Sequence, residues 1–118
     1  MSRQTSERQG PLTDIRVIEM GQLIAGPFCG QLFADMGADV IKVEPPGKGD
    51  PMRTWGREGY PLWWKVCARN KRCITANLRE KDGQDIIKKL VKEADFILEN
   101  FRPGTMEKWG LSYEDLKV

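Results

Sequence analysis

Residues 15–44, IRVIEMGQLIAGPFCGQLFADMGADVIKVE, decide the fold of this chain. Its two ends, IRVIEM and DVIKVE, are short and rich in β-branched residues, which is typical of strands. Between them, apolar residues recur at the spacing of one face of a helix, namely Phe28, Leu32, Phe33 and Met36. A helix between two strands predicts a βαβ unit, in which the two strands are parallel.

The segment GQLIAGP (21–27) joins the first strand to the helix. Pro27 suits the first turn of a helix, where its missing N–H costs nothing, and Gly37 ends the helix. The segment lacks the G-x-G-x-x-G pattern of dinucleotide sites. It is compatible with a tight βα turn, or with an anion site in which the helix N-terminus offers free N–H groups.

The alternation continues beyond residue 44. PPGKGDP (45–51) predicts a loop that runs to about residue 61, and residues 62–66 fit a helix or a strand equally well. The remaining predicted elements are strands at 72–78 and 96–100, a helix at 81–94, a short helix at 105–109 and a helix opened by Ser112 with Asp115. This order predicts an α/β protein with an open, doubly wound sheet.

Composition limits the function classes. A chain of 118 residues with 40% apolar and 31% charged residues predicts one small globular domain. The net charge of +2 gives no support for nucleic-acid binding, and the longest apolar runs are far below the ~18 residues of a membrane span. Residues 1–10 are polar and have no secretory h-region, so we interpret them as a disordered tail before a domain at 11–118.

The chain contains no histidine, which excludes Ser–His and Cys–His pairs and His-ligated metal sites within it. Its three cysteines, Cys29, Cys67 and Cys73, lack C-x-x-C spacing and indicate neither a disulfide framework nor a zinc site. Buried structural thiols in a reducing cytoplasm are the favoured interpretation, ahead of a catalytic cysteine.

Basic residues gather near the predicted strand ends. RNKR (69–72) precedes the third strand and Arg79 follows it, while Arg102 and Lys108 follow the fourth. These residues fit either solvated surface charges or groups that hold phosphates, and their spacing alone leaves both interpretations open.

Three motifs in order carry a resemblance to a known family. They are LIAGPFCGQLFADMGADVIKVEPPGKGDPMRTWG (23–56), NKRCITANL (70–78) and ADFILENFRPGTMEKWGLSYEDL (94–116). Together they resemble the N-terminal part of the class III CoA-transferases, also called the CaiB/BaiF family, from about Pro11 to the end. The resemblance implies a Rossmann-like open parallel sheet that forms the N-terminal portion of the large domain, and a homodimer of interlocked subunits.

The resemblance also implies a site for coenzyme A, bound as the substrate acyl-CoA. Motif position assigns the CoA contacts to residues that follow the four strands, with Lys108 in place of a frequent arginine and Pro45 where some members carry one. The residues implied are Ile24, Ala25, Pro45, Ala76, Asn77, Leu78, Arg79, Asn100, Phe101, Arg102 and Lys108. Neither a metal ion nor a membrane partner is implied.

The family resemblance places the nucleophile outside this chain. Transferase members use an aspartate well downstream of ENFRPG to form a mixed anhydride with the acyl group, and CoA then passes to an acceptor carboxylic acid. Asp35, Asp39 and Asp50 do not match that motif, so no catalytic residue is assigned. Two alternatives remain, an acyl-CoA racemase of the same family and a stand-alone, non-catalytic CoA-binding module.

Overall fold

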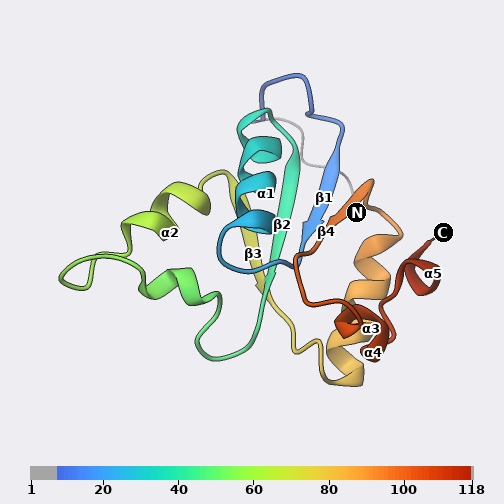
Figure 1. Ribbon diagram of the computed structural model, residues 1–118. Coiled ribbons are helices and arrows are strands. Elements are labelled where there is room, and N and C mark those ends of the chain that lie inside the picture. The colour runs from blue at the N-terminus through green and yellow to red at the C-terminus, as the bar shows by residue number, and fades with distance from the viewer. Residues whose placement is uncertain (1–7, 118) are drawn as a thin grey trace.

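The computed structural model describes residues 8–117 and shows strands and helices in alternation (Figure 1). The elements are β1 (Arg16–Glu19), α1 (Ala25–Asp35), β2 (Asp39–Glu44), the 3₁₀ helix η1 (Pro51–Thr54), α2 (Leu62–Cys67), β3 (Lys71–Thr75), α3 (Lys81–Val91), β4 (Phe96–Leu98), α4 (Thr105–Lys108) and α5 (Tyr113–Leu116).

The four strands form one parallel sheet in the order β3-β2-β1-β4, which confirms the predicted α/β fold. β2 and β3 lie on one side of β1 and β4 lies on the other. The chain therefore changes direction across the sheet at β1, and ligands of open α/β sheets bind in the crevice outside the strand ends at such a point.

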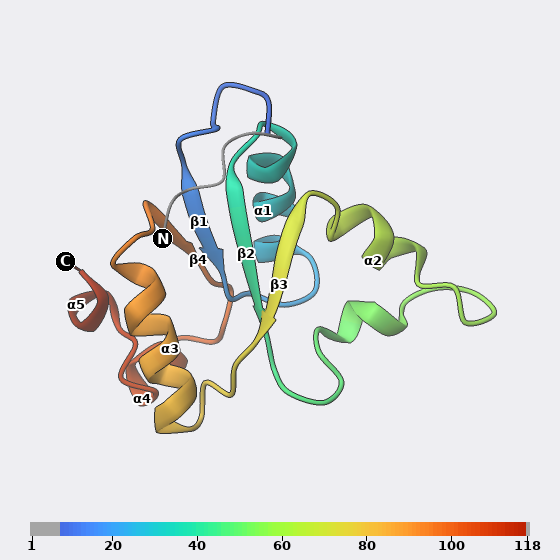
Figure 2. The same cartoon turned by 180° about the vertical axis from the view of Figure 1, so that it is seen from behind.

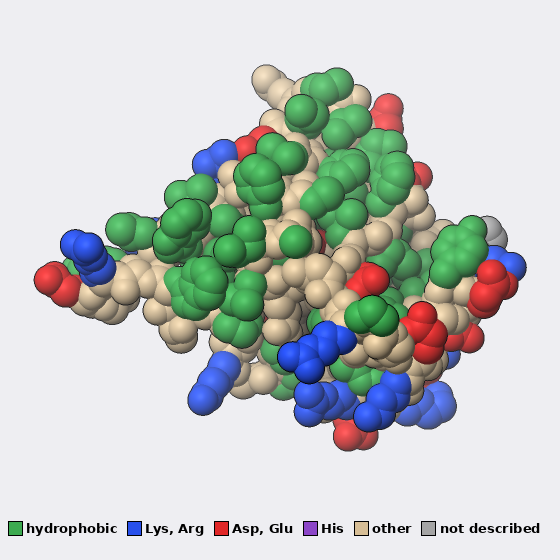
Figure 3. Space-filling view, viewed as in Figure 1, with side chains coloured by type: hydrophobic (Ala, Val, Ile, Leu, Met, Phe, Trp, Pro, Cys, Tyr) green, Lys and Arg blue, Asp and Glu red, His purple; other side chains and the backbone are tan. Residues whose placement is uncertain are grey.

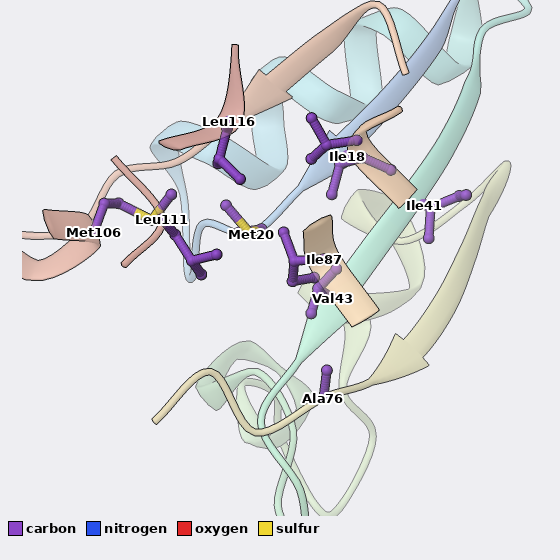
Figure 4. Packing of buried hydrophobic residues seen from close by; sticks show 10 residues of the cluster. Ile18, Met20, Ile41, Val43, Ala76, Ile87, Met106, Leu111 and Leu116 are labelled. Atoms are coloured by element: carbon purple, nitrogen blue, oxygen red, sulfur yellow. The ribbon is translucent and has the colours of Figure 1, made fainter. Parts of the chain in front are cut away.

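Two apolar cores cover the two faces of the sheet, because successive residues of a strand point to opposite faces. Ile18, Ile41 and Val43 pack with Ile87 of α3 in the larger core (Figure 4). On the other face, below α1, a smaller core contains Val17, Ala34, Ala38 and Val40. Figure 2 shows α3 on the near face of the sheet and α1 behind it.

Helix α1 is oriented differently from the usual amphipathic pattern. Phe28, Leu32 and Met36, on its apolar stripe, are about half exposed, and Phe33 is partly buried. Its buried residues are instead small or polar: Gly26, Pro27, Gly30, Gln31 and Ala34. The reason is that the sheet below it carries buried charged side chains as well as apolar ones, and small residues let α1 approach them closely.

Other predicted elements hold with shifted bounds. Residues 62–67 form a helix, which settles the open choice there, and the loop before it contains η1. β3 ends at Thr75, so Ala76–Leu78 follow the strand rather than extend it. The capping box predicted at Ser112 and Asp115 is present.

Two further expectations concern the chain start and the thiols. Residues 1–7 of the expected disordered tail lie outside the described residues, and Arg8 Nη1 lies 3.1 Å from Asp39 Oδ1. The expectation of buried thiols holds for Cys67 only, because Cys29 is partly exposed and Cys73 is exposed. No helix within residues 8–117 has both the length and the apolar character that a membrane crossing requires.

Candidate functional site

A hollow of about 600 Å³ lies at the carboxyl ends of all four strands. We call it the strand-end hollow and define it by the residues that line it. They are Met20 and Gln22 after β1, Val43, Glu44, Pro45 and Pro46 at the end of β2, Ala76, Asn77, Leu78 and Arg79 after β3, and Phe101, Arg102, Thr105 and Trp109 after β4.

Most residues predicted for the CoA site meet in this hollow. Pro45, Ala76, Asn77, Leu78, Arg79, Phe101 and Arg102 all line it. Four others do not. Ile24 and Ala25 lie exposed at the start of α1, Lys108 lies exposed on α4, and Asn100 is exposed beside the first βα turn.

The hollow combines an aromatic wall with cationic groups. Phe101 and Trp109 pack edge to face, with their ring centroids 5.1 Å apart. Arg79 and Arg102 are exposed at the rim, where guanidinium groups can bind phosphate oxygens in bidentate fashion. Figure 3 shows basic side chains gathered at the end of the molecule where α3 and α4 lie. An aromatic surface beside two cations suits a ligand that carries both a ring and phosphates.

Glu44 provides the acidic group of the hollow. Arg53 donates two hydrogen bonds of 2.7 Å to its carboxylate, and the Asp50 N–H donates a third of 2.9 Å. Burial alone would raise the pKa of Glu44, but these bonds outweigh it and hold the pKa below its ordinary value. The Arg53 guanidinium also stacks on Trp64, 3.9 Å from the ring centroid. Glu44 therefore stays ionised and held in place.

A cluster of buried charges lies below α1, next to the hollow. Lys42 Nζ contacts Glu19 Oε2 at 2.8 Å, Asp50 Oδ2 at 2.8 Å and the Gly21 carbonyl at 3.1 Å, which uses all three ammonium donors. Lys71 Nζ lies 2.6 Å from Glu19 Oε1, and all four charged side chains are almost fully buried. Two lysines balance two carboxylates, so the cluster is neutral overall.

The two lysines respond differently to this burial. Burial favours the neutral amine in both. In Lys42 the contacts with Glu19 and Asp50 outweigh burial and raise the pKa. In Lys71 burial prevails over the contact with Glu19, and the pKa is lowered.

The first βα turn is held by side chains from elsewhere in the chain. Leu23 adopts a left-handed backbone conformation with φ of 64°, which is uncommon for a residue other than glycine. Its N–H faces both carboxylate oxygens of Asp50, at 3.2 and 3.3 Å. The Asn100 amide accepts from the Gln22 N–H at 2.8 Å and donates to the Gln22 carbonyl at 2.9 Å.

The aspartates considered as nucleophiles are all engaged in ion pairs. Asp39 lies at the amino end of β2, opposite the hollow, and contacts Arg16 and Arg72. Burial would raise its pKa, but these arginines hold it below the ordinary value. Asp35 pairs with Arg69, and Asp50 belongs to the buried cluster. Among residues 8–117 no group of three or more Asp, Glu, Cys or His residues is arranged to hold a metal ion.

Sequence reasoning missed several residues of the hollow, among them Gln22, Thr105 and Trp109. Trp109 was detectable in part, because it follows a short helix just beyond ENFRPG. Gln22 was not, since nothing in the sequence signals that Leu23 adopts a left-handed conformation. In the folded protein Gln22 lines the hollow and Ile24 does not.

Comparisons with known proteins identify relatives of this chain. The chain is 61% identical over 98% of its length to succinyl-CoA–D-citramalate CoA-transferase of Chloroflexus aurantiacus, of which it covers 29%. It is 44% identical over 94% of its length to succinate–glutarate CoA-transferase of Agrobacterium fabrum, of which it covers 30%. The chain thus spans about 30% of the length of these relatives.

Solved structures show the same fold. A CaiB/BaiF family protein from Brucella suis matches with a TM-score of 0.84 and 44% identity, over 92% of this chain and 30% of that one. Rv3272 of Mycobacterium tuberculosis matches with a TM-score of 0.85 and 39% identity, over 93% of this chain and 31% of that one. A model of CoA-transferase family III matches residues 12–118, and the chain belongs to this family.

Proposed function

We propose that this chain is the CoA-binding N-terminal part of an enzyme that transfers CoA between carboxylic acids. The observation that carries the proposal is the strand-end hollow, in which Arg79 and Arg102 stand beside an aromatic wall at the carboxyl ends of the parallel strands. CoA combines an adenine ring with a ribose phosphate and a pyrophosphate. It therefore matches both kinds of surface.

The volume and position of the hollow support this ligand. About 600 Å³ lies within the range of small-molecule sites, and the site is open enough for an extended ligand to leave it. We assign the adenine and ribose phosphate to the segment Ala76–Arg79, as the family resemblance implies. Arg102 then stands on the opposite side of the hollow, after β4.

We propose that the nucleophilic aspartate lies outside residues 1–118. In this family such an aspartate attacks the thioester carbonyl, forms a mixed anhydride and expels CoA thiolate. The thiolate attacks the aspartyl carbonyl of the anhydride, which releases the donor acid and leaves an aspartyl-CoA thioester. The acceptor carboxylate attacks this thioester and expels the thiolate, and the thiolate then attacks the acceptor carbonyl of the new anhydride, giving the new acyl-CoA and the free aspartate. Asp35, Asp39 and Asp50 are each held by a cation away from the hollow lining, which supports this proposal. The chain alone should therefore bind CoA without transferring it.

We propose a dicarboxylic acid as the acceptor and succinyl-CoA as a donor. The names of the relatives support this choice, since citramalate and glutarate are both dicarboxylic acids. A racemase acting on 2-methylacyl-CoA is the second candidate within the family, because CoA binding is common to both activities. The whole enzyme is proposed to be an interlocked homodimer located in the cytoplasm.

Two assays of the whole protein separate these activities. Succinyl-CoA with citramalate should give citramalyl-CoA and succinate, detected by mass spectrometry. A chiral 2-methylacyl-CoA should keep its configuration. Racemisation without transfer would reject the proposed reaction, and binding without either activity would support the non-catalytic module.

A binding experiment tests the site itself. Arg79→Ala and Arg102→Ala should each weaken CoA binding in calorimetric titration by ~1–3 kcal/mol, the usual scale for a lost hydrogen bond to a charged group. Lys108→Ala tests whether this residue, which lies outside the hollow lining, contributes as the resemblance implies. Lys88→Ala, on the exposed side of α3, is the matched control and should change binding by less than ~0.5 kcal/mol. Equal losses in the control would place the site elsewhere.

A further inference from the structure

We propose that Asn100, Asp50 and Lys42 are positioning residues that fix the backbone of the first βα turn and thereby shape the CoA site. This inference rests on the proposed function for the identity of the ligand. The geometry of the turn supports it independently of that function.

The three side chains bond successive backbone groups of the turn. Lys42 binds the Gly21 carbonyl, Asn100 binds both the N–H and the carbonyl of Gln22, and Asp50 binds the Leu23 N–H. They come from three separate parts of the chain: β2, the segment after β4 and the loop after β2. Residues this far apart in sequence meet at one turn only in the folded sheet.

The turn needs such support because of its conformation. A leucine at φ of 64° is strained, and strained residues persist only where the surrounding structure determines them. Close packing adds to the constraint, since a Cβ on Gly21 would lie 2.3 Å from Asn100 Oδ1. The turn that follows β1 is thus held from both sides of that strand, by Lys42 of β2 and by Asn100 after β4.

The family resemblance implies that Asn100 contacts CoA, whereas the proposal gives Asn100 an indirect role. Both polar atoms of its amide are bonded to Gln22, and Asn100 is not among the residues that line the hollow, whereas Gln22 is. Asn100 therefore acts on a ligand through Gln22. Asp50 is 1% exposed, and its carboxylate is bonded to Lys42, to the Leu23 N–H and to the Met52 N–H, so it too acts on a ligand through the backbone that it holds.

The first readout is hydrogen–deuterium exchange in the whole protein without ligand. Asn100→Ala should accelerate exchange of the Gln22 amide. Asn100→Asp keeps the acceptor oxygen and should leave that amide protected. Thr54→Ala removes another exposed side-chain bond to the backbone, from Thr54 Oγ1 to the Pro51 carbonyl, and should leave the turn unchanged. Unchanged exchange in Asn100→Ala would overturn the proposal.

The second readout is CoA affinity measured by calorimetric titration. Asn100→Ala and Asp50→Asn should each weaken binding about tenfold, and the double variant should lose little more, because both act on one turn. A loss in Asn100→Ala alone, or losses that multiply in the double variant, would show that Asn100 contacts CoA directly and would overturn the positioning role. If Asp50→Asn fails to fold, Asn100→Ala and Asn100→Asp still decide the question by exchange.

The two readouts separate this inference from the proposed function. A wild-type protein that does not bind CoA would reject the proposed function. Amide exchange at Gln22 would still decide whether Asn100 holds the turn.

Discussion

Gly30→Ala should destabilise the protein, although alanine is the better helix former. Gly30 faces the buried charge cluster, and a Cβ built there would lie 1.9 Å from Glu19 Oε1 and 2.9 Å from Glu19 Cδ. Real Cβ contacts essentially never fall below 3.0 Å, so Glu19 or helix α1 must move by about 1 Å. Glu19 is held by two buried lysines, at 2.8 and 2.6 Å, and cannot move without lengthening those contacts.

The magnitude follows from three contributions. Overpacking a core costs ~1–3 kcal/mol, and disrupting a buried ion pair costs up to ~3–5 kcal/mol. Alanine in place of glycine in a helix returns about 1 kcal/mol. The ion pairs of Glu19 are lengthened rather than removed, so only part of the second cost applies. We therefore expect a net loss of ~2–4 kcal/mol in the free energy of unfolding, measured by urea denaturation followed by circular dichroism.

Two comparisons isolate the cause. Gly26→Ala, in the same helix, meets neighbours only at 3.1 and 3.2 Å and should cost less than ~1 kcal/mol. Glu19→Asp shortens the carboxylate side chain, so Gly30→Ala should cost less in that background than in the wild type. A stabilising Gly30→Ala, or strictly additive effects with Glu19→Asp, would refute the reasoning.

Three further predictions concern stability and association. Ile87→Ala, at a fully buried position of the larger core, should lower the free energy of unfolding by ~2–5 kcal/mol, and a loss below ~1 kcal/mol in urea denaturation would contradict that core. The pKa of Asp39 is lowered from 3.8, so its ion pairs stabilise the fold above pH 3.8, and this stabilisation is lost as the pH falls through the pKa of the folded state. Asp39→Asn should therefore reduce the loss of unfolding free energy on acidification, measured by urea denaturation at several pH values. An unchanged pH dependence would argue against the role of these ion pairs. The 118-residue chain should self-associate through the exposed apolar side chains of α1 and α2, which gather on one surface in Figure 3. Its sedimentation should depend on concentration, and Phe28→Ser and Trp63→Ser should weaken that dependence. A monomer at all concentrations would contradict the prediction.

Periodicity was sufficient to predict the sheet. Strand segments at 15–20 and 39–44 carry enough β-branched residues to identify the βαβ unit, and Ile87 and Val91 are buried as the helical spacing at 81–94 suggests. Propensity does not decide the short segment at 62–66, where the protein has a helix. Its Trp64 stacks on Arg53, a tertiary contact that no local pattern reports.

The orientation of α1 could not be derived from its apolar spacing. Hydrophobic periodicity identifies a stripe but not what lies opposite the other face. Here Lys42 and Glu19 occupy the sheet positions below the helix, and Gly30 fits over them. The charged residues within the predicted strands, such as Glu19 and Lys42, were the only sign of this cluster in the sequence. Charged side chains are seldom fully buried, so a strand that contains them is normally expected to expose them.

Seven of the eleven residues that the family resemblance implies line the hollow, but motif matching could not separate residues at the hollow from residues that support a neighbouring turn. Arg79 and Phe101 line the hollow because residues after parallel strands meet at one edge of the sheet. Asn100 belongs to the same motif, yet its amide is bonded to the backbone of another turn. Only atomic geometry reveals that difference.

The outermost strands also determine how copies of this sheet could join. Within residues 8–117, β3 and β4 each pair with a neighbour on one side only. The charged side chains near these edges are already engaged within the chain: Lys71 is buried against Glu19, Arg72 is paired with Asp39, and Asp95 accepts from the Arg16 N–H. What each edge offers is therefore its row of backbone N–H and C=O groups, which can pair with a further strand. Because no free charge pair drives such pairing, added salt would change it little.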